Sequence, residues 1–143
     1  MPHALVDLNY LRLAWPSPAD DPFNLQLALR NLSAVAGSYR AAGVERLAVA
    51  YLRSSRRDAE GFARAIGGDR MLVCRLRARP ATVEARLRHR HRGEAPRELP
   101  WFLERFEVLQ DELEAAAIDG VVIDVDRLTP AEVARQVLEV VGW

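Results

Sequence analysis

Four short apolar runs alternate along the chain with longer segments in which apolar residues recur every three or four positions. The runs lie at residues 4–8, 46–52, 71–76 and 120–125. Each run is nearly continuous in apolar character, which is typical of strands covered on both faces. Strands that alternate with helices predict an α/β fold with a mainly parallel sheet and right-handed crossovers.

Capping residues mark where the intervening helices begin and end. Asp21-Pro22 predicts an N-cap followed by a first helical proline, and Gly43 predicts the end of that helix. Thr129-Pro130-Ala131-Glu132 has the residues of a capping box at the start of the last helix. The other predicted helix starts are near Ser55, Pro80 and Leu99.

Length and charge narrow the class of protein. The 143 residues match one domain, so we expect a single α/β domain over residues 1–143. A formal net charge of zero argues against general binding to nucleic acid or to a membrane surface. The one cysteine cannot form an internal disulfide, and no apolar stretch reaches the length of a membrane span. We therefore expect a soluble, cytoplasmic protein with no membrane partner.

The basic residues are all of one type. The chain has no lysine, and its 20 basic residues are arginines. A phosphate-binding P-loop of the form GxxxxGK[ST] needs a lysine that reaches the β- and γ-phosphates. The sequence therefore contains no such loop, and it contains no GxGxxG spacing either.

Several segments nevertheless resemble small P-loop kinases. HALVDLNYL at residues 3–11, DPFN at 21–24 and LRNL at 29–32 resemble the second-strand region of bacterial kinase-like proteins described as adenylylsulfate-kinase-like or AAA-type ATPases. VCRL at 73–76, the arginine-rich helix to Arg92 and VIDVD at 122–126 resemble a fourth strand, a lid and a fifth strand. The resemblance implies a three-layer α/β/α fold that lacks the first strand, the P-loop and the first helix. It also implies a lid-like region at about residues 80–117.

The resemblance has a consequence for strand pairing. In such kinases the missing strand lies in the middle of the sheet, between the strands that correspond here to residues 46–52 and 71–76. Without it, two rows of backbone groups face each other without partners, which is unfavourable. We expect these strands either to pair directly or to accept a strand from another chain, in a homodimer or with a different partner. Whether the phosphate loop is encoded upstream of Met1 or has been lost stays open.

Asp7-Leu8-Asn9 ends the first predicted strand, where ligands gather in open α/β sheets. The resemblance implies that Asp7 holds Mg²⁺ or receives the acceptor hydroxyl. It also implies that Asn9, Arg12 and Arg53 contact the substrate. The alternatives are that Asp7 caps a neighbouring loop and that Arg53 is solvated at the surface.

Arginines and histidines cluster from the third predicted strand to the end of the lid helix. The cluster comprises Arg75, Arg77, Arg79, Arg86, Arg88, His89, Arg90, His91 and Arg92. Guanidinium groups suit phosphate because they present a rigid fork of donors. The resemblance implies that Arg86 and Arg90 stabilise the transferred phosphoryl group and that Arg92 contacts the nucleotide. The alternatives are a solvated helix face and, less favoured by the neutral net charge, a nucleic-acid site.

Asp126-Arg127 follows the last predicted strand, where the resemblance implies contact with the adenine base. The alternative is an ordinary turn before Thr129. Together these features predict a phosphotransferase-type domain that uses ATP and Mg²⁺ only if a phosphate loop is supplied, and that is inactive without one. The alternative function is a non-catalytic interaction module on a degenerate kinase fold.

Overall fold

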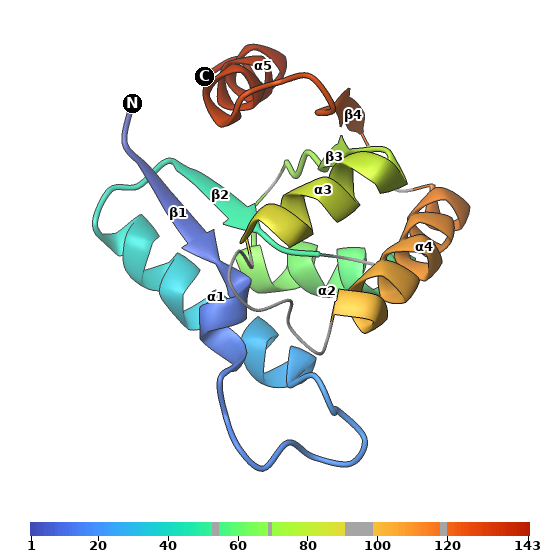
Figure 1. The fold of residues 1–143 in the computed structure, drawn as a ribbon. Coiled ribbons are helices and arrows are strands. Elements are labelled where there is room, and N and C mark those ends of the chain that lie inside the picture. Colours follow the sequence, from blue (N-terminus) through green and yellow to red (C-terminus); the bar gives the residue numbers. More distant parts are fainter. Residues whose placement is uncertain (53–54, 69, 91–98, 118–119) are drawn as a thin grey trace. The chain divides into compact units, whose positions relative to one another are not determined.

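The computed structural model describes residues 1–52, 55–68, 70–90, 99–117 and 120–143 (Figure 1). These residues form a mixed α/β structure made of two compact units, Met1–Met71 and Leu72–Trp143. Each unit contains one two-stranded parallel sheet and its own helices. The two units are therefore described separately.

The first unit is built on strands β1 (His3–Asp7) and β2 (Arg46–Ala50). The strands run parallel, with His3 opposite Arg46 and Asp7 opposite Ala50. Between them the chain forms the short 3₁₀ helix η1 (Leu8–Arg12) and the helix α1 (Leu25–Ala41), and α2 (Arg56–Ile66) follows β2. A parallel pair needs such a crossover, because the chain must return to the start of the neighbouring strand.

The core of the first unit lies on one face of its sheet. The buried residues of this core are Val6, Leu8, Ala28, Leu32 and Phe62. They come from β1, η1, α1 and α2, so both helices contribute to the covered face. On the opposite face of β1, Leu5 is 71% exposed. Within this unit the helices cover one face of the strand, and the expectation that both faces are covered is not met by the residues of the unit itself.

The second unit repeats the parallel arrangement with strands β3 (Cys74–Arg77) and β4 (Val121–Asp124). Helices α3 (Pro80–Arg90) and α4 (Leu99–Ala116) lie between the strands in sequence and pack against each other. Helix α5 (Pro130–Val141) follows β4 and contacts it. The buried apolar residues here are Leu99, Leu113, Ile123 and Val125.

The strand pairs are β1 with β2 and β3 with β4, and each pair forms a sheet of its own. Direct pairing between the strands of residues 46–52 and 71–76 was one of two sequence-based expectations. The strand pairing of the described residues does not include it. The parallel direction within each pair is as expected.

The helix signals in the sequence are mostly confirmed. The Ser55 side chain caps α2, Pro80 begins α3, and α4 begins at Leu99. Thr129 and Glu132 form the predicted capping box. Among the described residues, none of the helices combines the length and apolar character that crossing a membrane requires.

The start of α1 differs from the prediction. The helix begins at Leu25, three residues after Pro22, because Asp21 caps it from a distance. The two Asp21 carboxylate oxygens accept hydrogen bonds from the backbone N–H groups of Leu25 at 2.7 Å and Gln26 at 2.8 Å. Its far end is as predicted, since Gly43 follows the helix with a φ of 85°.

Asn24 fixes the loop that leads into α1. Its side chain is buried, and its backbone is left-handed with a φ of 52°. The Nδ2 group donates to the carbonyl oxygens of Arg12 at 3.0 Å and Ala14 at 2.9 Å, and to the hydroxyl of Ser17 at 3.0 Å. One amide group therefore joins the two ends of the loop.

We expect Asn24→Ala to lower the free energy of unfolding by about 2–4 kcal/mol, because it leaves acceptors without their donor and puts alanine at a positive φ. Asn24→Gly should cost about 1 kcal/mol less, because glycine adopts this backbone conformation freely. Urea unfolding followed by circular dichroism measures both. A loss below about 1 kcal/mol in both variants would contradict this role for Asn24.

Candidate functional site

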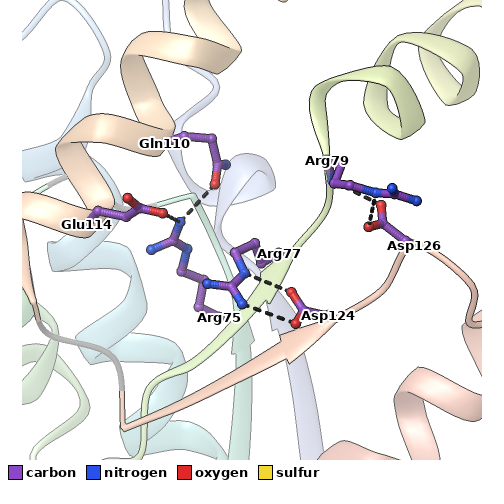
Figure 2. Close-up of polar contacts among 7 residues, drawn as sticks. All are labelled: Arg75, Arg77, Arg79, Gln110, Glu114, Asp124 and Asp126. Atoms are coloured by element: carbon purple, nitrogen blue, oxygen red, sulfur yellow. Dashed lines mark hydrogen bonds and ion pairs between the residues drawn. The ribbon is translucent and has the colours of Figure 1, made fainter.

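The carboxyl edge of the second sheet carries two ion pairs, which Figure 2 shows side by side. Arg77 ends β3 and Asp124 ends β4, and the two residues are opposite each other in the strand register. Arg77 donates from Nε to Asp124 Oδ1 at 2.7 Å and from Nη2 to Oδ2 at 3.1 Å. These hydrogen bonds lower the pKa of Asp124 and raise that of Arg77. The charge of Arg77 is therefore already matched by a carboxylate.

Asp126 makes the second pair. Its Oδ1 accepts from the backbone N–H of Arg79 at 2.9 Å, and its Oδ2 accepts from Arg79 Nε at 2.8 Å (Figure 2). These bonds, with one from the Thr82 side chain, lower the pKa of Asp126 to about 2. The carboxylate joins the start of α3 to the turn after β4. Arg127 is exposed in the same turn, so this geometry matches the turn interpretation of Asp126-Arg127.

Arg75 points to the other side of β3, toward α4 (Figure 2). Its side chain is buried and donates from Nη2 to Gln110 Oε1 at 2.8 Å, with Glu114 Oε1 at 3.5 Å. Burial of a charged group is unfavourable unless the group has partners of this kind. Arg75 therefore connects β3 to α4 and does not belong to the carboxyl edge.

Helix α3 presents a cationic face beside this edge. Arg86 Nη2 donates to the carbonyl oxygen of Val125, directly after β4, at 2.6 Å. Small-ligand sites are commonly clefts of about 300–1,000 Å³, and the residues of α3 line a shallow hollow of ≈ 790 Å³ that is open to solvent. Its lining residues are Ala81, Thr82, Ala85, Arg86, His89 and Arg90. The structure thus brings together Arg86 and Arg90, two of the predicted residues, with His89 between them.

The remaining arginines of α3 and β3 differ in their pairing. Arg88 donates to Glu84 Oε1 from both Nε and Nη2, at 3.0 and 2.7 Å. Within residues 70–90, 99–117 and 120–143, no carboxylate pairs with Arg86 or Arg90. The alternative interpretation, a solvated helix face whose charge is balanced by acidic residues, therefore applies to Arg88. Within the same residues, the charges of Arg86 and Arg90 remain available to a ligand.

Asp7 acts as the N-cap of η1 in the first unit. Its Oδ1 accepts from the backbone N–H and from Nδ2 of Asn9, both at 2.9 Å. This is the capping geometry of the alternative interpretation, although the Asp7 side chain remains exposed. Among the described residues, no group of three or more His, Cys, Asp or Glu side chains is arranged to hold a metal ion. Mg²⁺ at Asp7 would need its other ligands from a nucleotide or from water.

Arg12, at the end of η1, lies over the ring of Tyr51 at 5.8 Å from its centroid. Tyr51 also packs against Phe62, with 5.3 Å between the ring centroids. Burial raises the pKa of the Tyr51 hydroxyl, and the nearby Arg12 charge partly offsets this effect. Arg12 is also part of the wall of a second cavity, of ≈ 450 Å³. Arg12 was predicted to contact a substrate, whereas the residues that complete this wall were not predicted from the sequence.

Those missed residues are Leu13, Ala14, Trp15, Pro22, Phe23 and Asn24. The sequence offers only a weak indication of this wall, namely two aromatic residues, Trp15 and Phe23, at the ends of a proline-rich loop. Arg53 and Arg92 lie outside the described residues. The predicted residues that the structure describes therefore form two groups, with Asp7, Asn9 and Arg12 in the first unit and Arg86, Arg90, Asp126 and Arg127 in the second.

We expect the Asp126 carboxyl to titrate near pH 2, below its ordinary value of 3.8. A depressed pKa in the folded state means that this carboxylate stabilises the protein above about pH 4 and that the contribution is lost as the pH falls toward 2. Carbon-13 NMR of the carboxyl group measures the midpoint, and Asp126→Asn identifies the resonance.

The largest cause of this shift is the backbone N–H of Arg79. Arg79→Gln keeps that N–H and should therefore raise the midpoint only in part. A midpoint at or above 3.8 in the unaltered chain would contradict the pairing described.

Comparisons with protein-family models, with curated proteins and with solved structures find no match for this chain. The assignment of a role to these residues therefore depends on their own geometry and on the resemblance of the sequence segments.

Proposed function

We propose that this chain is the body of a kinase-like, phosphotransferase-type domain, in which Arg86 and Arg90 of α3 bind phosphate groups. The proposal includes a three-layer, P-loop-kinase-like arrangement that lacks the first strand, the P-loop and the first helix. ATP and Mg²⁺ are its cofactors when a phosphate loop is supplied from outside residues 1–143.

The observation that carries the proposal is the cationic face of α3. The Arg86–Val125 hydrogen bond places this face next to the carboxyl end of β4. Ligands of open α/β sheets bind at the carboxyl ends of the strands. Two guanidinium groups with no carboxylate partner among the described residues, beside an open hollow at this edge, suit a polyphosphate better than a neutral ligand.

Each residue of the proposed site has its own chemical role. Arg86 and Arg90 neutralise the negative charge of the phosphoryl group while it passes from donor to acceptor. Asp7, at the carboxyl end of β1, orients Mg²⁺ through water or receives the acceptor proton. The P-loop normally adds backbone donors, a lysine and a metal-binding hydroxyl. Since this sequence has no P-loop and no lysine, residues 1–143 lack these three contributions, and the proposal assigns them to a loop supplied from outside.

Tripolyphosphate binding tests the role of the α3 face. We expect weak binding by the unaltered chain at low salt, and a loss of about tenfold in affinity for Arg86→Ala and for Arg90→Ala. Arg88→Ala is the matched control, because Arg88 lies on the same helix but is paired with Glu84. Phosphorus NMR titration measures all four proteins. An equal loss in Arg88→Ala would show that only the net charge of the helix matters.

ATP binding tests the part of the proposal that concerns the P-loop. By calorimetry, we expect the 143-residue chain to bind MgATP more weakly than micromolar and to show no ATP hydrolysis. Micromolar affinity would contradict the dependence on an external phosphate loop. It would leave open which residues of this chain replace the loop, and the arginine variants would then identify them.

A second candidate function is the binding of a partner strand, and the size of the sheets favours it. Each sheet of the described residues has two parallel strands, whereas parallel sheets are ordinarily larger and covered on both faces. An added strand from a second copy or another protein would extend such a sheet by main-chain hydrogen bonds. Sedimentation velocity over a range of concentrations tests the homodimer, and a species that stays monomeric would contradict it.

A further inference from the structure

The loop of residues 13–24 in the first unit has a fixed backbone. Asn24 joins its two ends through the three hydrogen bonds described above. The Asp21 N–H donates to the Pro18 carbonyl at 3.1 Å, and the Asn24 N–H donates to the Asp21 carbonyl at 2.9 Å. Hydrogen bonds of this kind restrict the loop backbone, so its surface can serve as a preformed site.

This fixed loop holds large apolar side chains in the open. Trp15 is 91% exposed and Phe23 is 64% exposed, and both line the cavity of ≈ 450 Å³. Leu13, in the same wall, is also exposed. Grouped apolar side chains that stay exposed commonly mark a place where a ligand binds. These side chains surround a shallow hollow that is wide open to solvent, which suits a flat molecule laid across it.

Arg12 gives the cavity a positive charge. The guanidinium is positioned by the Tyr51 ring, and Arg12 belongs to the cavity wall. No carboxylate of the described part of the chain forms an ion pair with it. Asp21, on the same loop, already accepts two backbone N–H groups of α1. The cavity therefore combines aromatic walls with a cation whose charge is not matched locally.

We propose that this cavity binds a small molecule made of a flat aromatic ring and an anionic group, with the ring between Trp15 and Phe23 and the anion at Arg12. The volume of the cavity is enough for one or two fused rings. Aromatic walls favour stacking with a ring, and a guanidinium favours a carboxylate or a phosphate ester. This site is separate in its residues from the α3 face, and its existence does not depend on the proposed function.

Ligand binding can be followed at the Trp15 indole N–H by two-dimensional NMR of the full chain, with Trp15→Phe identifying the signal. The probe is naphthalene-2-carboxylate, and the neutral comparison is naphthalene-2-methanol. We expect a saturable shift of the Trp15 signal with the carboxylate at about millimolar affinity or better, and about tenfold weaker binding of the alcohol. The indole signals of Trp101 and Trp143, which belong to the second unit, should stay in place. Naphthyl phosphate distinguishes a phosphate ester from a carboxylate as the preferred anion.

Variants separate the two parts of the site. Phe23→Ala should weaken binding of the carboxylate about tenfold, and Arg12→Gln should abolish the preference over the alcohol. Leu5→Ala is the matched control, because Leu5 is an exposed apolar residue of the same unit outside the cavity. Phe23→Leu serves if Phe23→Ala does not fold. The proposal is overturned by an unsaturable Trp15 shift, by equal losses in the Leu5 and Phe23 variants, or by a preference that survives Arg12→Gln.

Discussion

Each unit of this protein depends on one parallel pair of strands. A parallel pair cannot close through a tight turn, so the chain must cross over through helices before it returns. Helix α1 makes this crossover in the first unit, and α3 with α4 makes it in the second. The same constraint brings the carboxyl ends of both strands to one edge. Polar residues that follow the strands are therefore collected at that edge whether or not they serve a ligand.

The pairing of arginines with carboxylates determines which of these polar residues remain available to a ligand. Asp124 and Asp126 are matched by Arg77 and Arg79, and Glu84 is matched by Arg88. These pairs at the surface contribute little stability individually, but they set the orientation of the side chains. Arg86 differs because it donates to a backbone carbonyl, and no carboxylate in the described part of the second unit pairs with it. Fewer of the nine arginines and histidines in the cluster are therefore available to a ligand than the sequence indicates.

The local structure was largely predictable from the sequence, because caps and strand runs act over a few residues. Ser55 and Thr129 cap their helices as predicted, since the backbone N–H groups that they accept from are three residues away. Pro80 begins α3 because it lacks the N–H that would stay unpaired at a helix start. The start of α1 was not predictable in the same way. The left-handed Asn24 allows Asp21 to cap the helix across three intervening residues. No spacing rule for adjacent caps describes that arrangement.

The sites were less predictable, because they depend on partners far apart in the sequence. The resemblance selected Arg86 and Arg90, and the structure places both on one cavity wall. It also selected Asp126, whose oxygens are used by Arg79, 47 residues away. The wall containing Trp15 and Phe23 was missed because scattered aromatic residues carry no periodic signal. Only the folded loop brings them around a common space.

The Arg86–Val125 contact also has an entropic consequence. An arginine on an exposed helix face ordinarily samples many rotamers, and a ligand that binds it must restrict that motion. The carbonyl of Val125 already restricts Arg86 in the free protein, at 2.6 Å from Nη2. Part of the ordering that binding would require has thus been completed during folding. If the α3 face binds an anion as proposed, the anion would meet one guanidinium that is already oriented, next to Arg90 on the same helix face.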